Sequence, residues 1–513
     1  MENNSFSMKC EQRVADGYVE SSAEYVLPDY NPDVRKILYT SCEVKPAGKI
    51  ASDDQVDFSG IVEYRCLYAD KDGEISEVRF TSDYEYGVSL AAEAEDAYSH
   101  PWVQNYQIRV LGPRKMSAKA SIACENVCTA TKGATSGGIP SGDDVELDRR
   151  NVRAGRLATV ESAEREIAEE IMRIDGVALD EITVVSGATE CSIGEFTRGD
   201  GEGKCRSDFF VKLIYRDRDG QLIPVEHSIA GEGSITLDGI SAEAQVVCAP
   251  RVLSERFECT PTDDGVSIVA NLIVKWDAVC VYNDEHSVVC DAYSTECALD
   301  NEYATLSLIN YCAPMRERLC IDGALSLEGG EGGKVKEVLL MGGRARIVEK
   351  KVEGGRLDVA VEIKAQGVVS TYDNNGTTAY VPVKISDTIA KKVNISSQKQ
   401  GVSGAIVRIL GVSISHKIDG DDIKYTACVD VDIIPYDEAW VRVLDSCARN
   451  ENEKIEKKAG RVTVYYSEPC DTLFSVAKKY HTAITSILEN NDIAAETALG
   501  EGGVALPKRI IIY

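Results

Sequence analysis

Two acidic turns, residues 70–73 and 217–220, come nearest in this chain to the spacing of a calcium site. An EF-hand loop needs oxygen ligands at its first, third and fifth positions and a bidentate glutamate at its twelfth. Tyr68 and Tyr215 occupy the first position, and Arg79 occupies the twelfth in the first copy. The Asp-Gly pairs that end both segments are typical of β-hairpin turns. We therefore predict hairpins here and no bound metal.

Other patterns that could support catalysis are incomplete. The glycine-rich segment 329–334 is no phosphate-binding loop, because Glu328 stands where that loop needs glycine and Val335 where it needs Ser or Thr. The histidines are spread along the chain, and the sequence pairs none of them with a nucleophilic Cys or Ser. They are His100, His227, His286, His416 and His481. We predict that the protein is not an enzyme and holds no cofactor.

The cysteines do not form a metal site either. There are 17 of them, scattered through the chain without a CxxC pair. The nearest pairs are Cys124/Cys128, Cys290/Cys297 and Cys312/Cys320. Zinc needs ligands that converge on a tetrahedron, and these spacings offer no such set. We expect free, partly buried thiols in a reducing cytosol, with oxidative cross-linking in an assembled layer as the alternative.

The C-terminal residues have the pattern of a small two-layer unit. A short strand at 462–465, an amphipathic helix, a second helical turn and a final apolar strand at 509–513 follow one another. Asp471 or Thr472 can cap the first helix, since either side chain can accept from its free N–H groups. The apolar positions of that helix share one face and are Leu473, Val476, Ala477 and Tyr480. We predict a unit of the order βααβ.

The segments 471–480 and 487–491 resemble a LysM domain, the small βααβ module that binds glycans containing N-acetylglucosamine. Cys470 stands where that family usually has glycine, and a Cβ with a thiol leaves less room for a sugar. The resemblance implies a groove for a partner or a glycan beside the two helices. Its predicted residues are Cys470, Asp471, Thr472, Phe474, Ile487, Asn490 and Asn491. Among them, Phe474 and Asn490 are the favoured contacts, with a place in the core as the alternative for Phe474.

A repeat fills the rest of the chain. Residues 64–80 and 211–227 match at an offset of 147, and a looser third copy begins at Val368. A second landmark follows each copy by about thirty residues, namely Arg109-Val110-Leu111, Arg251-Val252-Leu253 and Arg408-Ile409-Leu410. Each Asp-Gly or Asn-Gly pair supplies the positive φ of a type I′ hairpin turn, and β-branched and aromatic residues flank it. Repeats of this length indicate three similar domains rather than a solenoid.

The predicted fold is mainly β, with three antiparallel β-sandwich or barrel-like repeats followed by the small βααβ unit. The expected boundaries are 1–130, 154–300 and 301–449 for the repeats, 131–153 and 450–461 for two linkers, and 462–513 for the LysM-like unit. Asn31 followed by Pro32 predicts a short helix over 31–38. The stretch 27–38 is interpreted as a lid on the first core, with a docking motif as the alternative. Residues 160–174 fit a helix or a strand, and the pattern leaves this open.

Charge and hydropathy limit the partners. The chain of 513 residues has 84 Asp and Glu against 56 Lys and Arg, so its net charge is −28. Such a field repels nucleic acid and anionic membranes. No apolar run reaches the length of a membrane span, and the first residues do not form a signal peptide. We therefore expect a cytoplasmic protein.

The stretch 27–38, the repeated Tyr-x-Asp-x-Asp-Gly hairpins and the C-terminal unit occur in one order. Because of these motifs and their order, the whole chain resembles the SipL-like spore morphogenesis proteins, which combine SPOCS domains with a C-terminal LysM domain. The resemblance implies a non-enzymatic spore-coat assembly and tethering protein of the mother-cell cytoplasm, at the forespore surface. It also implies that the LysM-like domain binds the spore-coat ATPase SpoIVA. The alternative is a protein that binds peptidoglycan or N-acetylglucosamine.

Overall fold

The protein is built almost entirely of antiparallel β-sheets, so the prediction of a mainly β fold is confirmed. The structure is a computed structural model. It describes residues 6–52, 54–89, 94–134, 140, 142–192, 194–326, 334–372, 378–395, 401–420, 422–455, 462–469, 471–493 and 506–513. Within each of the stretches 6–134, 145–294 and 297–454, strands pair with one another to form two sheets.

The first pair of sheets packs face to face as a β-sandwich, the first sandwich. One sheet has the order β1 (Phe6–Val26), β6 (Lys115–Ala134), β5 (Ala94–Gly112), and the other β2 (Lys36–Ser52), β3 (Gln55–Ala69), β4 (Ile75–Ser89). Alternate residues of β3 and β6 point into the space between them. Tyr64 and Tyr68 meet Met116 and Ile122 there, and all four are fully buried.

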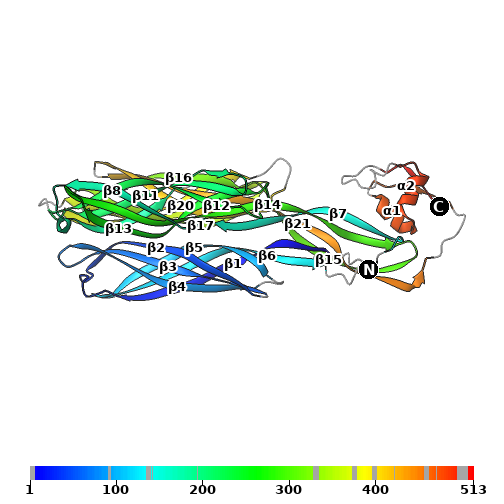
Figure 1. Ribbon diagram of the computed structural model, residues 1–513, viewed down its shortest axis with the longest axis horizontal. Helices are drawn as coiled ribbons and strands as arrows, with labels where there is room; N and C mark the ends of the chain where they lie inside the picture. Colours follow the sequence, from blue (N-terminus) through cyan, green and yellow to red (C-terminus); the bar gives the residue numbers. More distant parts are fainter. Residues whose placement is uncertain are drawn as a thin grey trace.

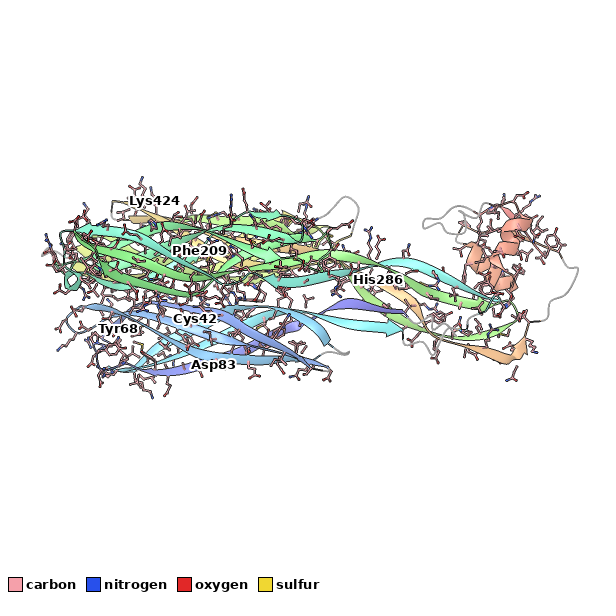
Figure 2. All side chains as sticks on the ribbon, in the orientation of Figure 1. Cys42, Tyr68, Asp83, Phe209, His286 and Lys424 are labelled. Atoms are coloured by element: carbon pink, nitrogen blue, oxygen red, sulfur yellow. A yellow bond between two sulfur atoms is a disulfide. The ribbon has the colours of Figure 1, made fainter. Side chains whose placement is uncertain are left out.

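The second sandwich follows the same plan. One sheet contains β7 (Val145–Glu161), β8 (Arg165–Asp175), β13 (Gln245–Pro261) and β14 (Gly265–Ser294). The other contains β9 (Thr183–Cys191), β10 (Phe196–Arg198), β11 (Glu202–Arg216) and β12 (Leu222–Thr236). A 3₁₀ turn, η1 (Leu179–Glu181), connects the two sheets. Trp276 and Phe209 lie at the centre of the core, where Figure 2 labels Phe209.

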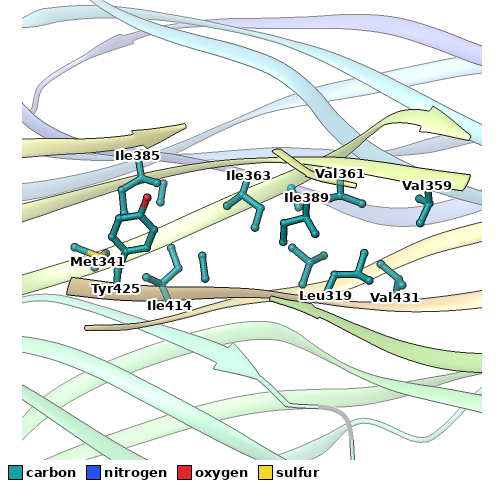
Figure 3. Close-up of a cluster of buried hydrophobic side chains, with 14 of the residues drawn as sticks. Leu319, Met341, Val359, Val361, Ile363, Ile385, Ile389, Ile414, Tyr425 and Val431 are labelled. Carbon is teal, nitrogen blue, oxygen red and sulfur yellow. The ribbon is translucent and has the colours of Figure 1, made fainter. Parts of the chain in front are cut away.

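The third sandwich completes the body. One sheet contains β15 (Cys297–Tyr311), β16 (Met315–Ser326), β20 (Gly404–Asp419) and β21 (Asp422–Lys454). The other has the order β17 (Lys334–Glu353), β18 (Arg356–Tyr372), β19 (Thr378–Asn394). Figure 3 shows its core, in which Val361 and Ile363 of β18 face Leu319 and Val431 of the opposite sheet.

The Asp-Gly pairs do form hairpin turns, but the turn type differs from the prediction. β3 and β4 are joined by a three-residue loop in which the Gly73 N–H donates to the Asp70 carbonyl and only Gly73 has a positive φ, of 85°. A type I′ turn would need two successive residues of positive φ. The Asp70 carboxylate accepts from the backbone N–H groups of Asp72 and Glu74. These carboxylates therefore stabilise the turn, and the second repeat has the same arrangement around Asp217. The third copy of this turn, residues 373–377, lies outside the described residues.

The predicted helix over 31–38 is wrong. Residues 31–35 form a loop and β2 begins at Lys36, because the loop is bound to strands on both sides. The Val34 N–H donates to the Pro113 carbonyl, and Arg114 donates to carbonyls of the same loop. Leu27 and Val34 are buried in the first core, so the interpretation of this stretch as a lid is confirmed. The undecided stretch 160–174 consists of the end of β7, a turn and most of β8.

The three sandwiches lie side by side and share two apolar junctions (Figure 1). At one junction Leu67, Ile214 and Val368 come from β3, β11 and β18 respectively. At the other, Val127 of β6 meets residues of β7, β14, β15, β20 and β21. Polar contacts add to this packing, for example from Arg79 to Glu255 at 2.7 Å. The body is therefore one packed bundle rather than a string of separate domains.

The second and third sandwiches extend beyond the first as a two-layer arm, formed by the ends of β7, β14, β15 and β21 (Figure 1). Asp144, just before β7, receives two hydrogen bonds from Arg449 of β21, at 2.7 and 2.8 Å. β6 ends at Ala134, β7 begins at Val145 and β21 ends at Lys454, so parts of both predicted linkers lie in strands. The long β14, of 30 residues, carries the chain to the tip of the arm.

The cysteines lie mostly within the sandwich cores. Ten of those described have free thiols, and seven of the ten are buried. Cys320 of β16 and Cys428 of β21 are directly opposite one another and form a disulfide. The expectation of free thiols therefore holds for the ten and fails for this pair, because the strand register brings two Cβ atoms face to face. Cys10, Cys128 and Cys470 lie outside the described side chains.

Candidate functional site

The chain ends in a small unit, the terminal module, at the tip of the arm (Figure 1). It consists of β22 (Thr463–Tyr466), α1 (Leu473–Tyr480), α2 (Ile484–Asn490) and β23 (Arg509–Ile512), with β22 and β23 paired antiparallel. The helices cover one face of the two strands. The residues of its core are Leu473, Val476, Ala477, Ile487, Ile510 and Ile512. The predicted order of elements is found. The predicted stripe of the first helix faces this core, with Leu473, Val476 and Ala477 buried and Tyr480 partly buried.

The start of α1 is defined by its cap. The Thr472 hydroxyl accepts from the Ser475 N–H at 3.0 Å, and the Ser475 hydroxyl accepts from the Thr472 N–H at 2.9 Å. This reciprocal pair satisfies two backbone donors that a helix start otherwise leaves free. Asp471, the alternative cap, instead accepts from the Tyr465 hydroxyl and the Glu468 N–H, both at 2.7 Å. It connects the first strand of the module to the helix.

Two of the predicted groove residues belong to the interior of the module. Ile487 is 1% exposed. The Asn491 amide donates to the carbonyls of Ile487 and Ile511 and accepts from the Ile511 N–H, at 2.7–2.8 Å. Asn491 thus connects α2 to β23, and its side chain is not available to a ligand. Thr472 and Asn490 are exposed, and Cys470 lies outside the described residues.

Phe474, the favoured aromatic contact, faces the arm of the same chain. Its ring packs edge-to-face on Tyr293 of β14, with 5.2 Å between ring centroids and 71° between planes. Tyr293 is 2% exposed and its hydroxyl donates to the Thr482 carbonyl at 2.8 Å. Burial of an aromatic pair of this kind stabilises an interface. An internal contact therefore occupies this face of α1.

An ion pair completes the docking of the module. Lys478 of α1 donates to both carboxylate oxygens of Asp291, at 2.6 and 2.7 Å. Burial acts to raise the pKa of Asp291, but hydrogen bonds from Lys478 and Tyr303 outweigh it and hold the pKa below its ordinary value. Sequence reasoning missed Asp291 and Tyr293, because nothing in the local pattern of a β-strand indicates what lies beyond its end.

The face of the module opposite the helices carries an apolar strip. Its members alternate along the two strands, so they point the same way. They are Val462, Val464, Tyr466 and Tyr513, which are 53%, 51%, 58% and 70% exposed. Arg509 lies over the Tyr466 ring at 5.7 Å. Among the described residues of the module, this strip and the exposed Thr472 and Asn490 are open to a partner.

A second candidate site is a cavity of about 740 Å³ where the three sandwiches meet. Strands of all three line it, including β2, β5, β9, β13, β14 and β20. Most of the charged groups in its wall are paired with one another or with neighbours. Lys45 pairs with Glu63 at 2.9 Å, and Arg251 pairs with Asp277 at 2.9 Å.

Glu43 of β2 faces this cavity without an ion-pair partner among the described residues. Burial raises the pKa of Glu43 to about 7, with Lys45 acting to lower it and Glu63 to raise it. The Glu43 side chain is exposed to water, but residues of all three sandwiches surround the cavity that it lines. A carboxylic acid in such a place stays protonated to a higher pH than usual.

This raised pKa makes the stability of the body depend on pH. Folded Glu43 binds its proton up to about pH 7, whereas the unfolded chain releases it near 4.5, so stability falls as pH rises between these values. We expect Glu43→Gln to reduce this slope, measured as the urea midpoint at several pH values. Glu85→Gln, a change at an exposed position of β4, is the control and should retain the slope. An unchanged slope in Glu43→Gln would contradict the assignment.

The structure brings together no metal site in the part of the chain it describes. Figure 2 shows His286 on the arm, whereas His100 lines the cavity. No helix among the described residues has the length and apolarity needed to cross a bilayer.

Comparison with known proteins adds little to this geometry. No protein-family model matches the chain, and no curated protein matches it significantly. Among solved structures, the ferric yersiniabactin uptake receptor FyuA from Yersinia pestis gives a likeness with a TM-score of 0.10 and 9% sequence identity. The likeness covers 83% of this chain and 80% of that one. A TM-score this low does not establish a shared fold.

Proposed function

We propose that the protein is a non-enzymatic assembly and tethering protein of the spore envelope, which binds the spore-coat ATPase SpoIVA through its terminal module. The observation that carries the proposal is the placement of a βααβ unit at the far end of a long β body. A partner held there is kept away from whatever the three sandwiches contact. Several weak contacts on one scaffold provide reach and avidity, as tethering requires.

The sequence resemblance supplies the identity of the partner, and the module geometry supports a protein over a sugar. Of the seven predicted groove residues, Ile487 and Asn491 make contacts within the module, and Phe474 packs on the arm. The part of the predicted groove that remains open to a sugar is small, whereas the exposed apolar strip along β22 and β23 suits contact with a protein surface. Cys470, in place of glycine, favours the same interpretation.

The three sandwiches correspond to the proposed SPOCS-like repeats. Strand pairing within 6–134, 145–294 and 297–454 supports this division, and so does the equivalent hairpin around Asp70 and Asp217. Mother-cell cytoplasm at the forespore surface is the proposed location. The Cys320–Cys428 disulfide is unusual for a reducing cytosol and fits a protein that ends in an assembled layer.

The proposal is tested by binding assays on the full-length chain with purified SpoIVA and, separately, with chitin and purified peptidoglycan. We expect saturable binding to SpoIVA and none to either glycan. Asn490→Ala should weaken SpoIVA binding about five- to thirtyfold, since a hydrogen bond at an interface contributes about 1–2 kcal/mol. Thr485→Ala, a change at another exposed position of the same helix, is the matched control and should bind normally.

Saturable retention on chitin together with no binding to SpoIVA would replace the tethering proposal with the glycan-binding alternative. Equal loss of SpoIVA binding in Asn490→Ala and Thr485→Ala would show that the helix contributes only through folding.

A further inference from the structure

The cavity between the sandwiches contains a buried cation that lacks hydrogen-bond partners. Arg408 of β20 is 5% exposed and lies in the cavity wall, yet its Nε and Nη1 atoms have no hydrogen-bond partner among the described residues. Its guanidinium lies over the Tyr98 ring, 5.9 Å from the centroid. A buried charge is costly unless an opposite charge or hydrogen bonds compensate it. Two unsatisfied N–H donors on a buried cation of the cavity wall therefore indicate a missing anion.

The nearest acidic residue in the strand register does not fill this role. Asp432 of β21 is directly opposite Arg408 and fully buried. Its carboxylate oxygens accept instead from Arg316, at 2.8 and 3.4 Å. Asp432 is therefore bound to Arg316, and the Nε and Nη1 donors of Arg408 have no partner among the described residues.

The other cavity cations near the same wall are already used. Arg251 is bound to Asp277 and donates to the Pro46 carbonyl at 3.1 Å. Arg65 is bound to Glu77 at 2.6 Å. His100 is neutral at physiological pH, because burial and the charge of Arg408 lower its pKa to about 3. An anion entering the cavity would therefore meet Arg408 as its main charged donor.

The acidic end of the cavity is distinct from this site. The charges that act on Glu43 are Lys45, Glu63, Glu255 and Arg79, whereas Arg408 acts on Tyr98 and His100. A ligand could therefore place an anionic group at Arg408 without facing the Glu43 carboxyl. The volume of about 740 Å³ lies within the range of small-molecule sites.

The geometry points to a binding site for a small molecule that presents a carboxylate or phosphate group to Arg408, inside the junction of the three sandwiches. The guanidinium donates charge-assisted hydrogen bonds to either group. Because strands of all three sandwiches line the cavity, a bound anion would also hold them together. This inference is independent of the proposed function, since it involves no residue of the terminal module.

The repeat provides a control for the test. Arg109 occupies the same landmark in the first repeat as Arg408 does in the third, but Arg109 is exposed. Titration calorimetry on the full-length protein, at constant ionic strength, would use inorganic phosphate and acetate as the probes. We expect one site per chain, with Arg408→Gln about ten- to hundredfold weaker and Arg109→Gln unchanged. The stronger of the two probes identifies the anionic group.

Binding of neither probe, or equal binding by wild type and Arg408→Gln, would overturn the site. If Arg408→Gln fails to fold, a crystal structure of the wild-type protein grown with the stronger probe decides the question. The proposal requires an anion within hydrogen-bond distance of the Arg408 guanidinium, and a cavity holding water only would refute it.

Discussion

Trp276→Ala is expected to lower the free energy of unfolding by about 3–5 kcal/mol, the usual range for removing a fully buried tryptophan. Trp276 is 0% exposed and packs edge-to-face on Phe209, with 6.0 Å between centroids. Its Nε1–H donates to the Ser207 hydroxyl at 3.1 Å. Truncation would leave both a cavity and an unpaired buried hydroxyl.

The surroundings of Trp276 cannot close such a cavity. The ring lies directly on Gly233, where an added Cβ would come 2.2 Å from the tryptophan Cε3 atom. That glycine has no side chain that could move into the vacated space. β14, the strand that carries Trp276, is paired with β7, β8 and β13, so the backbone is not free to collapse. The decrease in the free energy of unfolding should therefore lie toward the upper end of the range of about 3–5 kcal/mol.

The measurement is urea unfolding followed by far-ultraviolet circular dichroism, with Trp440→Ala as the control. Trp440 also lies in a long central strand, β21, but is 69% exposed, so its removal should change stability by less than about 0.5 kcal/mol. Similar losses in both variants would show that the Trp276 core is not packed as described.

Tyr293→Ala should release the terminal module from the arm. The side chain is 2% exposed, packs on Phe474 and donates its hydroxyl to the Thr482 carbonyl. Losing a buried aromatic residue costs about 3 kcal/mol or more, which shifts the docking equilibrium over a hundredfold. Small-angle X-ray scattering should then show a larger maximum dimension, and a protease should cut the chain before the module sooner.

The control for docking is Tyr466→Ala, which removes a tyrosine of the module that is 58% exposed and turned away from the arm. It should leave the scattering curve unchanged. A docked module in Tyr293→Ala would disprove the role of this contact.

The Asp291–Lys478 pair makes docking of the module depend on pH, with a known sign. Because the folded pKa of Asp291 is lowered, its contribution is present above the ordinary carboxyl value and lost as pH falls through the lower folded value.

Docking and the proposed partner site are linked through α1. The same helix presents Phe474 to the arm and is capped by Thr472, which is exposed beside the predicted groove. A partner that needs Phe474 must first separate the module from Tyr293, whereas one that uses the outer strip need not. Comparing SpoIVA binding by wild type and Tyr293→Ala distinguishes these two modes.

Local patterns predicted local structure well. The Asp-Gly pairs indicated hairpins, the alternation of apolar residues indicated strands, and Thr472 was one of two expected helix caps. Errors arose where distant segments compete with local preference. Asn31-Pro32 would start a helix in isolation, but backbone bonds to Pro113 and Ala69 hold that segment extended. The turn type also differed, because the adjoining strands allow a three-residue loop.

The sequence by itself determined the strand-rich architecture, the hairpin positions and the order of elements in the terminal module. These depend on side-chain alternation, glycine conformation and capping, which act over a few neighbouring residues. Tertiary structure decided which surfaces stay open. It placed Phe474 against Tyr293, opposed Cys320 to Cys428, and enclosed Arg408 with no described hydrogen-bond partner at Nε and Nη1. Each of these results depends on strands far apart in the chain meeting in one register, and no local pattern encodes that meeting.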